Sequence, residues 1–208
     1  MENFNRHHHW ENIYKTKQLR EVGWFQQVPQ TSLEFLKEFK VPLSAKIIDI
    51  GGGDSFFVDH LLALGYRDIT VLDISETAIE RAKQRLGEKA ANVKWIIADA
   101  ANFTPPERYD FWHDRAAFHF LTQDHEVENY IQSVQQAMSQ DGILVIGTFS
   151  VNGPKKCSGI KIRQYSETSM ADILKRFFQK IRCFTIDHKT PSGVIQNYVF
   201  CSFRKPVV

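Results

Sequence analysis

A glycine turn between an apolar run and an amphipathic run constrains this chain most. Lys46–Ile50 is almost continuous in isoleucine, Gly51, Gly52 and Gly53 follow, and Phe56–Leu64 then repeats apolar residues at helical spacing. Such an apolar run is typical of a parallel strand that is covered on both faces. Glycines let the backbone adopt positive φ and approach a ligand closely. The pattern predicts a strand, a loop and a helix that together bind a nucleotide-like ligand.

The remainder of the chain alternates strands and helices. Strands are predicted at Lys46–Ile50, Ile69–Leu72, Val93–Ala98, Tyr109–His113 and Gly142–Phe149, with helices at Phe56–Leu64, Glu76–Leu86 and Val127–Ser139. Alternation of this kind implies right-handed crossovers and a parallel sheet with helices on both faces. After a helix near Ser169–Phe178, the runs Ile181–His188 and Gln196–Phe203 are predicted to form an antiparallel hairpin. Two further helices are expected before the sheet, at Trp10–Lys17 and from Thr31 to before Pro42.

Bulk properties favour one domain that acts on neither nucleic acid nor membranes. The 208 residues carry a formal net charge of +2, and Lys and Arg are interspersed with Asp and Glu. The apolar runs are strand-sized, and the first residues contain no apolar signal region. Three cysteines without paired spacing indicate reduced thiols, so a cytoplasmic location is expected. His7-His8-His9 is too short to predict a metal site, and no metal is expected.

The glycine turn differs from two common phosphate-binding loops. Phe56 stands where a dinucleotide fingerprint has its third glycine, and no Gly-Lys-Ser/Thr run follows. Asp49 at the end of the first strand would repel a pyrophosphate but suits a cation. Asp73 ends the second strand, where a carboxylate can accept hydrogen bonds from a ribose, although it could also cap the next helix. Asp99, after the third strand, either meets an adenine amine or is a solvated loop residue.

These residues resemble those of the class I S-adenosylmethionine-dependent methyltransferases from about Ala45 to Phe149. The resemblance implies an α/β, Rossmann-like, mostly parallel seven-stranded sheet with an antiparallel C-terminal hairpin, and S-adenosylmethionine as cofactor. Ser55 departs from the pattern, because the family often has a third loop glycine there. The residues that the resemblance implies at the cofactor are Asp49, Gly51 and Gly53 beside the methionine part, Asp73 at the ribose, Ile74 against the adenine ring, Asp99 and Ala100 at the adenine edge, and Asp114 facing cofactor and substrate.

The N-terminal phrases His9–Tyr14 and Glu21–Gln26 are similar to the lids of a methyltransferase subgroup that includes some protein-lysine methyltransferases. Residues 1–44 are therefore expected to form a helical lid, and residues 45–208 the methyltransferase domain. The lid aromatics either pack on the core or line the pocket around the sulfonium, where an aromatic face attracts a cation. They are Trp10, Tyr14, Trp24 and Phe25, of which Trp24 is predicted to contact the cofactor.

The resemblance implies methyl transfer by in-line displacement, and a small molecule with an N, S or O nucleophile is the expected acceptor. Protein-lysine methylation, a non-catalytic cofactor-binding module and a dehydrogenase remain alternatives. His119, Tyr14 and Asp114 are candidates for moving a proton, and none of them is singled out. Asp114-Arg115-Ala116-Ala117 replaces the Asn/Asp-Pro-Pro-Tyr/Phe run of nucleic-acid amino methyltransferases, so nucleic acid is not expected as a partner. The segment Ser150–Thr168, which contains Cys157 as a loop thiol, is expected to determine the substrate, and the protein to be a monomer or weak homodimer.

Overall fold

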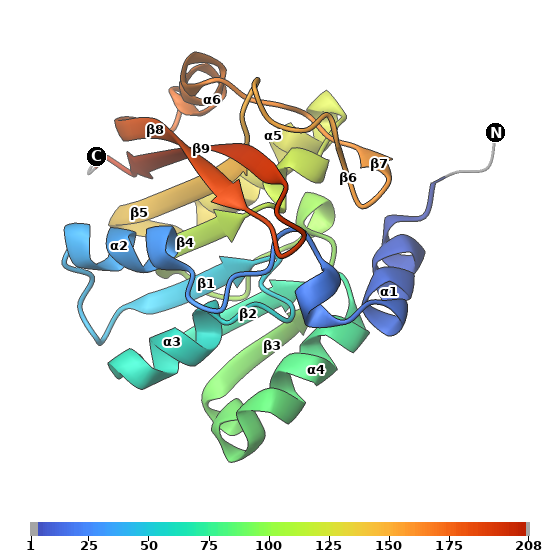
Figure 1. Cartoon of the computed structure of the whole chain (residues 1–208). Coiled ribbons are helices and arrows are strands. Elements are labelled where there is room, and N and C mark those ends of the chain that lie inside the picture. Colours follow the sequence, from blue (N-terminus) through green and yellow to red (C-terminus); the bar gives the residue numbers. More distant parts are fainter. Residues whose placement is uncertain (1–3, 207–208) are drawn as a thin grey trace.

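A seven-stranded sheet organises the computed structural model, which describes residues 4–206. The strand order is β3-β2-β1-β4-β5-β9-β8, with parallel pairing from β3 to β5 and antiparallel pairing of β9 with both β5 and β8 (Figure 1). The strands are β1 Lys46–Ile50, β2 Asp68–Asp73, β3 Val93–Ile97, β4 Tyr109–Arg115, β5 Met138–Phe149, β8 Gln179–Lys189 and β9 Ile195–Arg204. The predicted fold class and terminal hairpin are confirmed.

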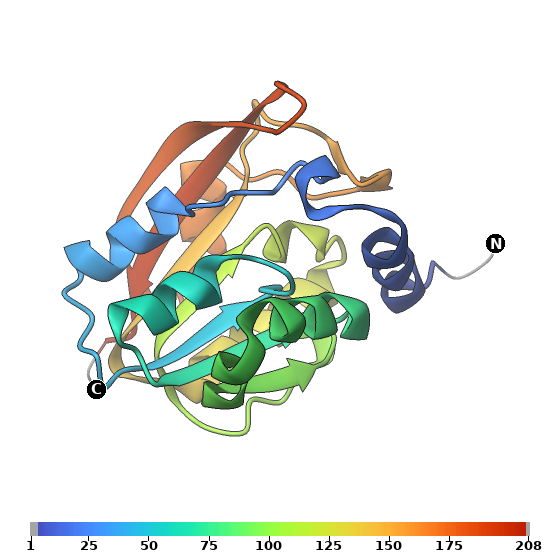
Figure 2. The same ribbon diagram turned by 60° about the horizontal axis from the view of Figure 1, so that its bottom comes forward.

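Helices cover the sheet on both faces, and side-chain alternation along each strand divides the core accordingly. Ile48 and Ile50 of β1 face one layer, formed by α5 (Asp124–Ala137) and α6 (Glu167–Leu174). Ile47 faces the other layer, which contains α2 (Gln30–Glu38) and α3 (Phe57–Leu64). Helix α4 (Glu76–Leu86) runs on this same side (Figure 2).

The start of β5 differs from the prediction. The strand begins at Met138, whereas the sequence pattern extends the preceding helix to Ser139 and starts the strand at Gly142. An irregularity in the β4–β5 register causes the difference, because Tyr109 pairs with Met138 but Phe111 pairs with Ile143. The intervening residues turn tightly enough that a Cβ at Gly142 would lie 2.9 Å from the Ser139 carbonyl oxygen. Bulges of this kind leave little trace in hydrophobic periodicity.

The N-terminal region has two distinct parts. Helix α1 (Arg6–Thr16) and the 3-10 turn η1 (Leu19–Glu21) lie off the carboxyl ends of the parallel strands, as Figures 1 and 2 show. Helix α2 instead packs on the sheet, with Phe35 1% exposed, although the predicted lid extends to residue 44. A small hairpin, β6 (Lys156–Cys157) with β7 (Ile160–Lys161), lies within the predicted substrate segment. Three further 3-10 turns are η2 (Gly87–Asn92), η3 (Ala100–Asn102) and η4 (Phe118–Phe120).

The expectation of three reduced thiols is wrong for two cysteines. Cys183 on β8 and Cys201 on β9 occupy paired register positions and form a disulfide, while Cys157 is free and buried. Directly opposed residues of antiparallel strands bring their Cβ atoms within disulfide range. The sequence separation of 18 residues does not reveal this register.

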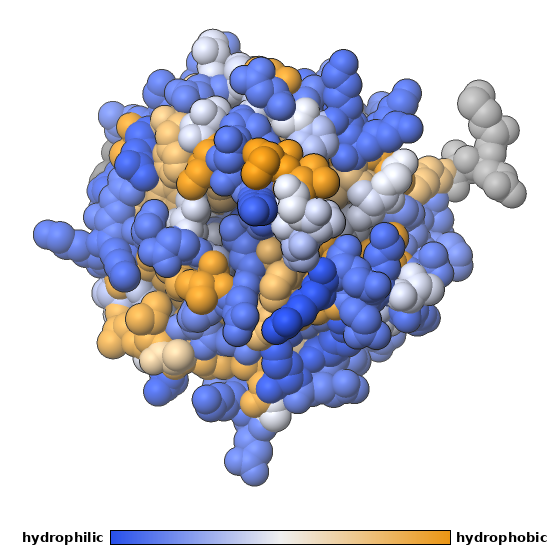
Figure 3. Space-filling view, viewed as in Figure 1, coloured by the Kyte–Doolittle hydropathy of each residue, from blue (hydrophilic) through white to orange (hydrophobic). Residues whose placement is uncertain are grey.

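The surface is mixed in character. Hydrophilic residues cover most of the face in Figure 3, with hydrophobic residues between them. The most exposed large apolar residues near the C-terminal hairpin are Val194 and Ile195, at 57% and 54%. Within residues 4–206, no helix is long and apolar enough to span a membrane.

Candidate functional site

Two glycines of the loop after β1 combine positive φ with a lack of room for a side chain. Gly51 has φ +65°, and a Cβ there would lie 2.6 Å from the Ala117 Cβ. Gly53 has φ +36°, and a Cβ there would lie 2.5 Å from Asp73 Oδ2. Positive φ strains residues other than glycine, and both contacts are shorter than packed atoms tolerate. The loop thus lies directly against the ends of β2 and β4.

Arginines on α4 hold the next part of the loop. Arg81 forms an ion pair with Asp54 at 2.9 Å, and Arg85 contacts the same carboxylate. Burial raises the pKa of Asp54, and the two guanidinium groups oppose that shift. Ser55, which stands where the family often has glycine, accepts a hydrogen bond from the Phe57 N–H at 3.1 Å. A serine at this position is therefore compatible with the loop, since its hydroxyl accepts from the first N–H group of α3.

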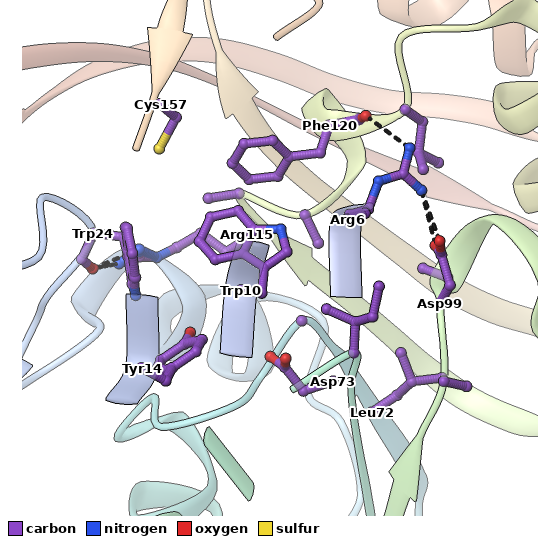
Figure 4. A pocket seen from close by; sticks show the side chains of 17 residues that line it. Arg6, Trp10, Tyr14, Trp24, Leu72, Asp73, Asp99, Arg115, Phe120 and Cys157 are labelled. Atoms are coloured by element: carbon purple, nitrogen blue, oxygen red, sulfur yellow. Dashed lines mark hydrogen bonds and ion pairs between the residues drawn. The ribbon is translucent and has the colours of Figure 1, made fainter. Parts of the chain in front are cut away.

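A cavity, here called the main pocket, lies beside this loop at the carboxyl ends of β1, β2 and β4 (Figure 4). The polar part of its wall includes Asp73, Asp99 and Arg6. The predicted cofactor residues that line it are Trp24, Gly51, Asp73, Ile74, Asp99 and Ala100. The structure thus brings together residues that the sequence reasoning assigned to one ligand.

Asp73 presents a buried carboxyl to the main pocket. Oδ1 accepts a hydrogen bond from the Ser75 N–H at 2.8 Å, and the side chain of Ser75, not that of Asp73, caps α4. Burial raises the pKa of Asp73 to about 7, and the nearby charges of Asp49 and Glu11 add to the shift. Ribose hydroxyls are the donors that such a carboxylate needs.

Asp99 is engaged by a residue that the sequence reasoning missed. The Arg6 guanidinium binds its two oxygens at 3.0 and 2.9 Å, and also binds Glu126 at 2.5 Å (Figure 4 draws the Asp99 contact). Asp99 additionally caps the turn η3 by accepting from the Ala101 N–H. Arg6 fastens α1 to the pocket end where the resemblance implies the adenine. No local pattern indicates this pairing, because 93 residues separate Arg6 from Asp99.

Glu11 fastens the middle of α1 to α4. Its carboxylate accepts hydrogen bonds from the Thr77 hydroxyl at 2.5 Å, the Thr77 N–H at 3.1 Å and the Ser75 hydroxyl at 3.0 Å. Burial alone would raise the pKa of Glu11, but these hydrogen bonds lower it to about 2. The carboxylate also meets the positive end of the α4 dipole. Glu11 was not recognised from the sequence as a contact residue.

Aromatic side chains from α1 and the following segment form one wall of the main pocket. The Trp10 ring lies 5.6 Å from that of Trp24 and 4.8 Å from that of Phe120, and Tyr14 meets Trp24 at 6.2 Å. Edge-on contacts of this kind are favourable. Burial, with the charges of Asp73 and Asp54, raises the pKa of Tyr14 well above its ordinary value. Tyr14 therefore keeps its proton at neutral pH.

A second cavity, here called the loop pocket, continues on the other side of Gly51 and is lined by Asp49. Asp49 Oδ1 lies 2.7 Å from His113 Nδ1, and His113 Nε2 lies 2.8 Å from the Ser32 hydroxyl. Since a carboxylate only accepts, Nδ1 carries the proton and donates to Asp49. Phe25 also lines the loop pocket, and its ring packs against Phe56.

Two of the proton-transfer candidates lie outside both pockets. Asp114 is fully buried: Oδ1 accepts from the N–H groups of Ala117 and Phe118, and Oδ2 from the Tyr130 hydroxyl at 2.8 Å. Burial raises its pKa to about 6. Strand alternation explains the placement, because Asp114 faces the α5 layer while Arg115 lines the pockets. His119 is also fully buried, against Phe149, and burial lowers its pKa to about 3.

Among residues 4–206, no group of three His, Cys, Asp or Glu side chains is placed to hold a metal ion. The sheet order, the glycine loop and the acids at three strand ends define a nucleotide-binding α/β domain. Its pocket offers a carboxylate for a ribose, apolar contact for a base and aromatic faces for a cation.

Comparisons with known proteins agree with this class. The sequence model of a methyltransferase-domain family matches residues 47–142. The human EEF1A lysine methyltransferase 2 is 26% identical over 153 residues, which cover 66% of this chain and 65% of that protein. A crystal structure of a SAM-dependent methyltransferase from Anabaena variabilis has a TM-score of 0.75 at 15% identity and covers 98% of this chain and 96% of that one.

A third comparison includes ligands. The Burkholderia thailandensis 1,6-didemethyltoxoflavin-N1-methyltransferase, with bound 1,6-didemethyltoxoflavin and S-adenosylhomocysteine, has a TM-score of 0.69 at 18% identity and covers 97% of this chain and 84% of that one. These findings support assignment of the chain to the class I S-adenosylmethionine-dependent methyltransferases, with S-adenosylmethionine as cofactor. It spans just under two thirds of the length of the human relative.

Proposed function

We propose that this protein transfers the methyl group of S-adenosylmethionine to a small molecule through a nitrogen, sulfur or oxygen nucleophile. The observation that carries the proposal is the pocket itself. Asp73, Ile74, Asp99 and Ala100 surround the proposed nucleoside position, and the same cavity continues under the aromatic wall. When bound, the cofactor supplies an activated methyl group. The chain must therefore bind and orient the acceptor against that group and exclude water from the site.

The pocket residues place a condition on the acceptor. Tyr14 lines the main pocket, but it keeps its proton and can only donate or orient there. Asp114 and His119 lie outside it. Since none of these three lies in the pocket as a base, the site is best suited to an acceptor atom that already carries an unprotonated lone pair, as a thiolate, a ring nitrogen or a weakly basic amine does. We infer that such nucleophiles, and not a strongly basic amine, are the preferred acceptors.

The enclosing wall favours a small acceptor. Trp10 and Tyr14 from α1, Phe120 from η4 and Cys157 from the β6–β7 hairpin all line the cavity. These side chains are mainly apolar and come from three separate segments, so they enclose a compact ligand more readily than an extended chain. The Burkholderia relative in fold, which binds 1,6-didemethyltoxoflavin, supports this choice.

Protein-lysine methylation is the second candidate, and the similarity to EEF1A lysine methyltransferase 2 favours it. A labelled-methyl assay separates the two candidates. The purified protein is incubated with methyl-labelled S-adenosylmethionine and either the low-molecular-weight or the protein fraction of a cell extract. We expect label in the small-molecule fraction, with Asp73→Ala, whose cofactor binding should be weaker, as the control. Label confined to protein, and released as methyl-lysine on hydrolysis, would replace the first candidate with the second.

A further inference from the structure

Arg115 is a cation at the junction of the two pockets. It is the last residue of β4, and it lines both the main pocket and the loop pocket, which meet beside Gly51. Its guanidinium donates to the carbonyl oxygen of Trp24, through Nη1 at 3.1 Å and through Nη2 (Figure 4). The side chain thus links the floor of the site to the segment that follows α1.

Arg115 forms no ion pair with a carboxylate among the described residues, and its guanidinium donates only to the Trp24 carbonyl oxygen. Asp49 is the acid whose charge acts on it, but Asp49 is hydrogen-bonded to His113. The guanidinium is partly buried, and desolvation lowers its pKa. A buried cation is stable only where a counter-charge and hydrogen-bond acceptors surround it. A single carbonyl takes two of the five N–H donors and supplies no counter-charge.

We propose that Arg115 binds a carboxylate of a ligand in this site, and that the methionine part of the cofactor provides it. The planar fork of a guanidinium matches a carboxylate in two parallel hydrogen bonds. The loop pocket contains Asp49 and Gly51, the two residues that the family resemblance places beside the methionine part. Arg115 lies on that side of the site, and the Trp24 carbonyl orients it. The inference rests on the proposed cofactor use, and a carboxylate on the acceptor is the second source of the same chemistry.

Calorimetric titration with two forms of the cofactor tests the proposal. S-adenosylmethionine and its decarboxylated form differ only in the carboxylate, and neither measurement depends on turnover. We expect the wild type to bind the first form roughly 10- to 100-fold more tightly. Arg115→Gln should bind both forms with similar affinity, close to that of the wild type for the decarboxylated form. Arg115→Lys should keep part of the preference, because it retains the charge without the fork.

Arg163→Gln is the matched control. Arg163 is also cationic, but it pairs with Asp124 and lines neither pocket, so its removal should leave the preference unchanged. Thermal unfolding of each variant without ligand checks that the fold is intact. If the wild type binds neither form, the proposed function fails independently of Arg115.

Two results overturn the assignment to the cofactor. An Arg115→Gln variant that loses affinity for both forms equally shows that Arg115 only positions Trp24. A variant that still prefers the carboxylated form of the cofactor as strongly as the wild type shows that Arg115 does not bind the cofactor carboxylate. A carboxylate on the acceptor is then the remaining ligand for Arg115. In that case Arg115→Gln should raise KM for a carboxylate-bearing acceptor but not for its amide analogue. An unchanged KM for both acceptors would then refute carboxylate binding altogether.

Discussion

Substituting Glu11 tests whether α1 closes the site by docking as a separate unit. Glu11 is held by three hydrogen bonds from Thr77 and Ser75, which lower its pKa from 4.5 to about 2. Hydrogen bonds that a charged group accepts are worth about 1.5–3 kcal/mol. Glu11→Gln keeps the length of the side chain and removes the charge. We expect α1 docking to weaken by about 2–3 kcal/mol, the order of one such hydrogen bond.

The loss should be local, because α1 contacts the domain at its edge while β1 lies in the core. Hydrogen exchange followed by mass spectrometry measures both segments in one experiment. Protection of α1 amides should fall by up to roughly 100-fold, and protection of β1 should stay unchanged. Affinity for S-adenosylhomocysteine should fall as well, because α1 carries Trp10 and Tyr14 into the pocket wall.

The pH dependence of the effect follows from the sign of the shift. A carboxyl with a depressed folded-state pKa stabilises the folded state above its unfolded value, here 4.5, and loses that contribution as the pH falls towards 2. The difference between wild type and Glu11→Gln should therefore be full at pH 7 and narrow below pH 4.5. Glu21→Gln is the control, since Glu21 is exposed and caps only η1. The reasoning is refuted if the α1 amides of Glu11→Gln exchange as slowly as those of the wild type. It is also refuted if Glu21→Gln loses as much α1 protection as Glu11→Gln does.

Three further substitutions test the pocket and the hairpin. Cofactor affinity should rise from pH 6 to pH 8 as Asp73, with a pKa of about 7, ionises. Asp73→Asn should abolish this pH dependence and weaken binding at pH 8 by about 1–3 kcal/mol in calorimetry. If the pH dependence remains in the variant, it belongs to another group. Gly53→Ala should lower the melting temperature more than Gly159→Ala does, because both have positive φ but only Gly53 has an atom within 4 Å of the added Cβ; equal melting temperatures would contradict this. Cys201→Ala removes the bond to Cys183 and should lower the free energy of unfolding in urea by about 2–4 kcal/mol; reduction of the wild type should have the same effect, and a reductant-insensitive wild type would show that the bond contributes nothing.

The cofactor pocket could be anticipated from the sequence because its residues lie at strand ends. Asp73 and Asp99 follow consecutive parallel strands, whose carboxyl ends share one edge of the sheet. Gly51 and Gly53 mark the turn directly. The positions of these residues follow from local pattern and sheet topology, and the structure places Gly51, Asp73 and Asp99 around one pocket.

Residues whose roles depend on tertiary contacts could not be anticipated in this way. Arg6 reaches Asp99 across 93 positions, and Glu11 reaches Thr77 across 66. A charged side chain on an N-terminal helix is ordinarily solvated, so neither residue stands out in the sequence. Asp114 shows the opposite problem. Its predicted role came from its place in the family pattern, which does not say which face of β4 the side chain occupies. His113 and Arg115 alternate with Asp114, and that alternation was available in the sequence.

Three contacts of the N-terminal segment should couple this segment to the bound cofactor. Arg6 binds Asp99 at the proposed adenine end, Glu11 binds α4, and the Trp24 carbonyl binds Arg115 at the proposed methionine end. A ligand that spans the main pocket and the loop pocket touches residues at both ends of this segment. Thermodynamic linkage then requires that cofactor binding stabilise α1 docking by as much as docking strengthens cofactor binding. Because the docked segment also forms the aromatic wall, the acceptor chamber should be complete only after the cofactor has bound.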